Sequence, residues 1–69
     1  MSLDTQILRL LTIIPGGTAE SIADDLTSLS GALVTERAVQ TELHALDDAG
    51  RVLMRNGFYR ISEAERART

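Results

Sequence analysis

The chain has 69 residues, a formal net charge of −3 and no cysteine. This length predicts one domain with a small core, and the lack of cysteine excludes disulfides and thiolate metal sites. The acidic balance argues against non-specific binding to nucleic acid, which depends on neutralising phosphates with Lys and Arg. The longest apolar cluster spans only residues 7–14, far short of the roughly 20 residues that cross a bilayer. No signal peptide is evident, so we expect a cytoplasmic protein without membrane contact.

The first predicted helix begins near Ser2 or Asp4 and ends before Pro15, which disfavours helical geometry in the residue preceding it. One face of this helix carries the large aliphatic residues Leu3, Ile7, Leu10, Leu11 and Ile14. Leu8 and Ile13 fall outside that face. Two interpretations stay open for them: a wide apolar face in a small protein, or a surface for dimerisation.

A second helix is predicted to start after Thr18, whose hydroxyl can cap the free N–H groups of its first turn, and it could continue to Leu29 before Ser30-Gly31 ends it. Its inward face is formed by the small and aliphatic residues Ala19, Ile22, Ala23 and Leu26. The connection to the next helix should be held against the core by its own aliphatic residues, Leu29, Leu33 and Val34.

The third predicted helix runs from the cap residue Thr35 to Ala49, where Gly50 supplies the left-handed residue that stops it. Its inward face is aliphatic and consists of Val39, Leu43 and Leu46. The opposite face is polar and carries Arg37, Thr41, His44 and Asp48, with Gln40 on the flank. The two faces are therefore cleanly separated.

The dipeptide Asn56-Gly57 predicts a type I′ turn between two strands, 52–55 and 58–61, because both residues tolerate a positive φ. A two-residue turn pairs Arg55 with Phe58 and carries the register on to Val52 and Ile61. Alternation along the strands then directs Val52, Met54, Tyr59 and Ile61 toward the helices, and Leu53, Arg55, Phe58 and Arg60 outward. Positions 51–60 hold three arginines and no acid.

Ser62 and Glu65 have the spacing of a capping box for one last helical turn. Residues 63–69 include no large apolar side chain, so we expect them to fray as a short C-terminal tail after a domain at residues 1–62. The predicted fold class is mainly α with a small β-hairpin.

Three stretches of the chain together resemble the bacterial and archaeal winged helix-turn-helix regulators. They are Thr18 to Leu26, the series Val39-x3-Leu43-x2-Leu46-x3-Gly50-x-Val52, and Phe58 to Ser62. The resemblance covers nearly the whole chain and implies a three-helix winged helix-turn-helix that binds duplex DNA as a small transcriptional regulator. The connection before the third helix is longer than the short turn of simple helix-turn-helix modules.

In this family the third helix enters the DNA major groove, and the hairpin, or wing, contacts the backbone or minor groove. Carried over by position, the helix residues expected to contact bases or phosphates are Glu36, Arg37, Gln40, Thr41 and His44. The corresponding wing residues are Arg55, Asn56, Gly57, Phe58 and Arg60. Arg can bond to guanine, Gln to adenine, and Thr to a base edge or the thymine methyl. A homodimer would place two recognition helices about one helical turn of DNA apart, with Leu8 and Ile13 as candidate dimer contacts.

A winged-helix module that binds protein and not DNA is the alternative function, because one fold can serve both purposes. The net acidity, the pair Asp47 and Asp48, and the outward Leu53 and Phe58 favour it. The polar face of the third helix could also be a solvated surface without a partner. A further alternative is that the chain is one domain of a longer regulator.

An enzyme is not expected from this sequence. The chain has a single histidine. Its two pairs of neighbouring acids, Asp24-Asp25 and Asp47-Asp48, lie on predicted helices, where adjacent side chains point about 100° apart and cannot converge as an acid–base pair. His44 and Asp48 offer only two ligands to a metal ion. We therefore expect no catalytic residues, no metal and no cofactor.

Overall fold

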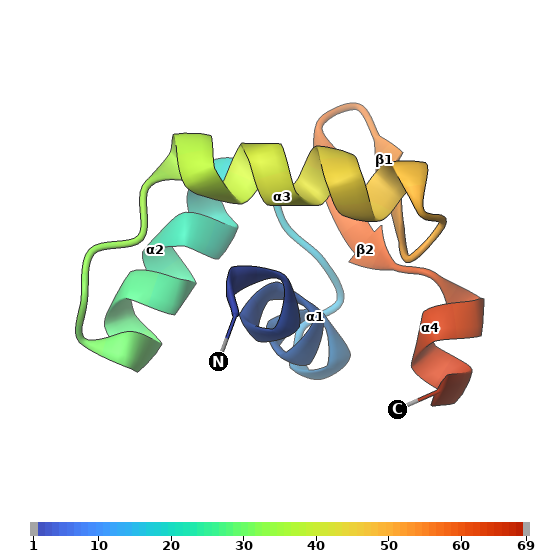
Figure 1. The fold of residues 1–69 in the computed structure, drawn as a ribbon, viewed down its shortest axis with the longest axis horizontal. Helices are drawn as coiled ribbons and strands as arrows, with labels where there is room; N and C mark the ends of the chain where they lie inside the picture. The colour runs from blue at the N-terminus through green and yellow to red at the C-terminus, as the bar shows by residue number, and fades with distance from the viewer. Residues whose placement is uncertain (1, 69) are drawn as a thin grey trace.

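A computed structural model describes residues 2–68 of the chain. Its helices are α1 (Leu3–Ile13), α2 (Ala19–Ser30), α3 (Glu36–Asp48) and α4 (Glu63–Arg68). Strands β1 (Val52–Arg55) and β2 (Phe58–Ile61) stand between α3 and α4 and pair as an antiparallel hairpin. The expected class, mainly α with a small hairpin, is confirmed. In Figure 1, α3 lies across α1 and α2, and the hairpin rises beside the C-terminal half of α3.

Local side-chain and glycine signals determine where the helices begin and end. Thr18 and Ser21 form a reciprocal capping box at the start of α2, with N–H···O distances of 3.2 and 3.0 Å. The Thr35 hydroxyl caps α3 by accepting from the Ala38 N–H at 3.2 Å. Gly31 and Gly50 adopt φ of +73° and +74° at the ends of α2 and α3, as their positions predicted.

The connection between α2 and α3 is held differently from our expectation. Leu29 and Leu33 are both exposed, so they do not pin it to the core. Val34 does pack against the core, and its N–H donates to the Thr27 hydroxyl at 2.9 Å while that hydroxyl donates to the Val34 carbonyl at 3.2 Å. The two hydrogen bonds of Thr27 therefore hold the connection in place of the expected apolar contacts of Leu29 and Leu33, whose side chains face solvent.

The hairpin has the predicted register, from Arg55 opposite Phe58 to Val52 opposite Ile61. Asn56 and Gly57 form its turn with φ of +53° and +79°, the conformation that a type I′ turn requires. Gly17 adds a third, single-residue pairing on the far side of β2: its N–H donates to the Tyr59 carbonyl at 2.9 Å, and the Tyr59 N–H donates to its carbonyl at 2.7 Å. The α1–α2 connection thus fixes β2 in place.

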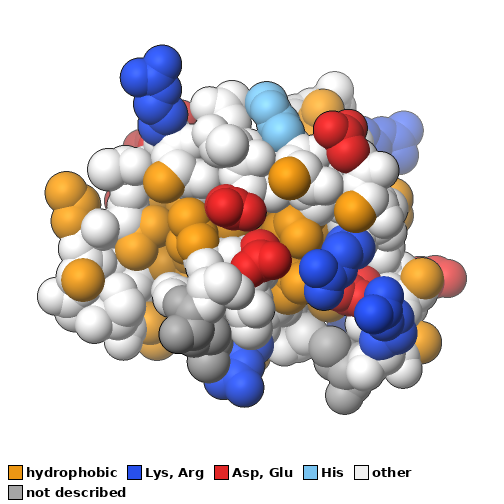
Figure 2. Space-filling view, in the orientation of Figure 1, with side chains coloured by type: hydrophobic (Ala, Val, Ile, Leu, Met, Phe, Trp, Pro, Cys, Tyr) orange, Lys and Arg blue, Asp and Glu red, His pale blue; other side chains and the backbone are white. Residues whose placement is uncertain are grey.

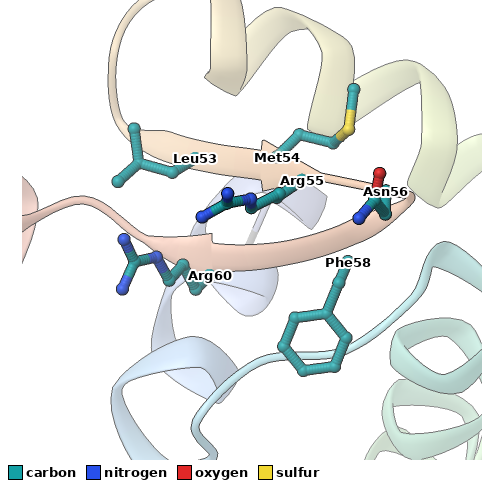
Figure 3. Close-up of a pocket in the computed structure, with 6 residues that line it drawn as sticks. All are labelled: Leu53, Met54, Arg55, Asn56, Phe58 and Arg60. Carbon is teal, nitrogen blue, oxygen red and sulfur yellow. The ribbon is translucent and has the colours of Figure 1, made fainter.

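The core lies where α1, α2 and α3 meet the base of the hairpin. Its largest fully buried side chains are Ile7, Leu11, Ile22, Val39, Leu43 and Val52. Tyr59 and Ile61 are buried as predicted, but Met54 remains 49 % exposed. Met54 faces α3 as predicted (Figure 3) but lies next to the last residue of β1, near the turn, and its side chain stays half exposed there.

Leu8 was expected outside the core face of α1, as a candidate dimer contact. It is buried instead and belongs to the core, so it cannot contact a partner. The reason is the C-terminal segment: Leu8 lines a depression together with Arg51 and Glu65. That segment covers the side of α1 that a three-helix bundle alone would leave open.

Residues 63–68 form α4 and contribute the buried Glu65, although we expected them to fray. The Glu65 N–H donates to the Ser62 hydroxyl at 3.2 Å, which is one half of the predicted capping box. The carboxylate does not return to the Ser62 N–H, because that N–H donates to the Arg51 carbonyl at 3.1 Å. Oε1 of Glu65 instead lies 2.6 Å from both Nε and Nη2 of Arg51. Arg68 adds a longer contact of 3.6 Å to Oε2. An ion pair therefore attaches α4 to the start of the hairpin.

Within residues 2–68, no helix combines the length and apolar character needed to cross a membrane.

Candidate nucleic-acid interface

The outward face of α3 carries all five helix residues that the sequence singled out. Glu36, Arg37, Gln40, Thr41 and His44 are exposed, whereas Val39, Leu43 and Leu46 point into the core. The Thr41 hydroxyl donates to the Arg37 carbonyl one turn earlier at 3.0 Å. This bond fixes the Thr41 side chain and leaves its oxygen lone pairs available as acceptors.

The hairpin turn projects to the same side of the molecule as the outward face of α3 (Figure 1). Arg55, Asn56, Gly57, Phe58 and Arg60, the five hairpin residues expected at the site, are all exposed. Because β1 follows α3 after only a short turn, the hairpin stands near the C-terminal end of that helix. The helix face and the turn therefore form one composite surface.

Figure 3 shows how the hairpin side chains divide. Leu53, Arg55 and Arg60 gather on one part of its surface, with the two guanidinium groups turned the same way. Met54 points to the other side, toward α3. With Asn56 and Phe58, these residues line an open depression of about 770 Å³. The depression combines two cations with exposed apolar surface.

Phe58 lies apart from the two arginines and reaches toward the α1–α2 connection (Figure 3). A Cβ placed on Gly16 would lie 2.5 Å from Phe58 Cε2 and 2.6 Å from the Tyr59 carbonyl oxygen. The ring therefore rests directly on the Gly16 backbone, which has φ of +150°. Phe58 braces the hairpin against the body of the protein while its outer part remains exposed.

The three arginines of the surface have free guanidinium groups. The two ion pairs found among residues 2–68 join Arg51 and Arg68 to Glu65, and neither includes Arg37, Arg55 or Arg60. Arg37 lies in the first turn of α3, about 16 Å along the helix axis from its C-terminal end. The cations thus form two separated positions, one at each end of α3.

Acidic side chains accompany these cations. Glu36 lies at the start of α3, and Asp47 and Asp48 are exposed at its end. On the face drawn in Figure 2, basic side chains lie in separate places, at the upper left, on the right and at the bottom, with hydrophobic and acidic groups between them. That face, which includes α1, is therefore not a continuous basic surface.

Sequence reasoning missed the part of the site that orients the hairpin. Gly16, Gly17 and Tyr59 couple β2 to the α1–α2 connection, a contact that the sequence did not predict. The available signal was the pair of adjacent glycines after Pro15, since an interior glycine can mark a close approach of two backbones. Its partner strand lies some 40 residues away, which local patterns do not reveal.

Among residues 2–68, no group of three or more His, Asp or Glu side chains is placed to hold a metal ion. The chemistry of the surface is that of charge, hydrogen bonding and apolar contact. Comparison of the chain with protein-family models, with curated protein sequences and with solved structures found no match.

Proposed function

We propose that the protein is a small winged helix-turn-helix that binds duplex DNA sequence-specifically, as a transcriptional regulator. The outward face of α3 enters the major groove, and the hairpin acts as the wing on the flanking backbone. The observation that carries this proposal is the placement of three exposed arginines that form no ion pair among residues 2–68, Arg37 in the first turn of α3 and Arg55 and Arg60 on the adjoining hairpin.

The spacing of these cations suits a duplex. The major groove admits one helix, and with α3 in it Arg37 in the first turn and the arginines of the adjoining hairpin can bind phosphates at two separate positions. Between them, Gln40, Thr41 and His44 present hydrogen-bonding groups to base edges. The acids on α3 face the same duplex and oppose non-specific binding, which favours recognition of particular bases.

Support for the wing comes from its rigidity. Gly17 pairs with Tyr59 on one side of β2, and the Phe58 ring rests on Gly16. A hairpin braced in this way holds Arg55 and Arg60 in fixed positions, so little conformational freedom is lost when they bind phosphates.

Fluorescence anisotropy with labelled duplexes, over a series of salt concentrations, tests the proposal. We expect Arg55→Ala with Arg60→Ala to weaken binding to all duplexes and to lower the slope of log K against log salt by about 1 per arginine. Arg68→Ala, which removes an exposed cation on α4, should change the slope little. If both variants behave alike, the hairpin does not contact DNA.

A protein-binding module is the second candidate, and one observation favours it. Leu53, Met54 and Phe58 line the depression on the hairpin and remain 42 %, 49 % and 47 % exposed, and large apolar side chains left exposed around a depression are typical of protein contacts. In that case duplex DNA should not bind at physiological salt, and Leu53→Ser should abolish capture of the partner protein.

A further inference from the structure

A groove between α1 and α2 remains outside the proposed DNA surface. Leu10 and Leu26 form its floor and are almost fully buried, whereas Ile13 and Leu29 protrude at its edges with 77 % and 71 % of their surface exposed. Its volume is about 320 Å³. Two large aliphatic side chains exposed beside an apolar depression form a surface that water solvates poorly.

The groove faces away from the outward side of α3. Its lining comes from α1 and α2 alone, and both of these helices pack their inner sides against α3. Figure 1 shows the same arrangement, with α3 above and α1 and the C-terminal part of α2 below. A partner in the groove would therefore leave α3 and the hairpin free.

We propose that the occupant of this groove is a second copy of the chain, which forms a back-to-back dimer. The groove is open along its length, so it does not enclose a small molecule as ligand pockets do. It carries both protruding residues and a depression, which is what a self-complementary two-fold interface requires. A two-fold axis along the groove lays α1 of each copy on α2 of the other and inserts Ile13 and Leu29 into the facing depression.

The charges flanking the groove are complementary under the same symmetry. Arg9 lies on the α1 side and is the only cation in residues 1–34. Asp25 lies one helical turn before Leu29, on the α2 side, and is exposed. Neither residue belongs to an ion pair found within residues 2–68. The two-fold axis brings Arg9 of each copy to the α2 side of the other, near Asp25.

A specific interface at the small end of the known range buries about 600 Å² per partner, or about an eighth of the 4542 Å² surface of the chain, and a small groove lined by two helices reaches at most that end of the range. The dimer should therefore be weak, with dissociation in the micromolar range or above.

This inference rests in one part on the proposed function, because it concerns how two DNA surfaces are arranged. In the back-to-back dimer the outward faces of the two α3 helices lie on opposite sides of the dimer. Such a dimer cannot place them on one face of a duplex one helical turn apart, the arrangement expected for a homodimer of the resembled family. It would instead hold two duplexes, one on each side.

The dimer is tested without DNA, by sedimentation velocity of the full chain from micromolar to millimolar concentration. We expect a reversible monomer–dimer equilibrium, which Ile13→Glu and Leu29→Glu should each weaken by at least about tenfold, or 1.4 kcal/mol. Leu33→Glu is the matched control, because Leu33 is 81 % exposed but does not line the groove. Circular dichroism confirms that each variant is folded.

The charge pair gives a second readout. Arg9→Glu should weaken the dimer, and adding Asp25→Arg should restore it. A wild-type chain that stays monomeric at millimolar concentration, or a dimer that Leu33→Glu disrupts as strongly as Ile13→Glu, would overturn the proposal. Failure of the charge swap to restore the dimer overturns the two-fold arrangement.

Bridging is measured separately, by capture of a labelled duplex on beads that carry a second duplex. Wild type should bridge, and Ile13→Glu should bind single duplexes but not bridge them. If no duplex binds at all, the proposed function is wrong, and the dimer is still tested by sedimentation velocity alone. If single duplexes bind and a proven dimer does not bridge them, the back-to-back arrangement is wrong.

Discussion

Replacement of Glu65 tests how α4 is attached to the domain. The Glu65 side chain is only 4 % exposed, whereas that of Arg51 is 36 % exposed. Oε1 of Glu65 forms an ion pair with both Nε and Nη2 of Arg51. Removing one partner of a fully buried ion pair costs about 3–5 kcal/mol, whereas an exposed pair contributes about 0–1 kcal/mol. Because Arg51 can regain water, we expect Glu65→Gln to cost about 2 kcal/mol, between these limits.

That loss is a large part of the stability of the chain. A domain of 69 residues has a free energy of unfolding of roughly 3–10 kcal/mol, so Glu65→Gln should lower Tm by about 8–16 °C. Urea and thermal unfolding followed by circular dichroism measure the change, with the exposed Glu63→Gln on the same helix as control. A double-mutant cycle with Arg51→Gln isolates the pair. If Glu65→Gln destabilises no more than Glu63→Gln, or the coupling energy is near zero, the ion pair does not hold α4.

Two further changes test the connections that local sequence patterns did not reveal. Gly16→Ala should destabilise the fold by more than about 2 kcal/mol, because the new Cβ would meet Phe58 and the Tyr59 carbonyl and the residue has a positive φ. In the control Gly31→Ala the new Cβ meets no neighbour, so this change should cost about 1 kcal/mol. Equal losses of stability in urea unfolding would contradict the contact between Gly16 and the hairpin. Thr27→Val should cost about 1–2 kcal/mol by leaving the Val34 N–H without its hydroxyl partner, whereas Thr12→Val, at an exposed hydroxyl on α1, should be nearly neutral in the same assay.

The predicted features that agree with the structure are those fixed by neighbours in the chain. Thr18 and Thr35 start helices, Gly50 stops one, and Asn56-Gly57 sets a hairpin register that holds over four residue pairs. In each case the determining contacts lie within a few residues, so the sequence contains the information locally. The outward face of α3 follows for the same reason, since helical periodicity separates its two faces.

The features that sequence reasoning missed depend on elements distant in the chain. Leu8 is buried because α4 and Arg51 cover that side of α1, and Met54 stays half exposed, although it faces α3, because it lies near the turn of the hairpin. Glu65 was interpreted as a helix cap, although a buried glutamate almost always has a cation beside it. No local pattern places Arg51, 14 residues earlier, next to that carboxylate.

If the protein binds DNA as proposed, the number of free cations limits how tightly one copy can bind it. If Arg37, Arg55 and Arg60 each neutralise one phosphate, log K should fall with log salt with a slope of about −2.7, whereas sites with 6–10 contacts give slopes two to three times steeper. Affinity of one copy should therefore be modest, and useful occupancy would require two linked copies, because a second binding event is favoured by effective concentration. A back-to-back dimer supplies that linkage only between two duplexes or two distant segments of one. A slope near zero would instead favour the protein-binding alternative, since apolar contacts at Leu53 and Phe58 respond little to salt.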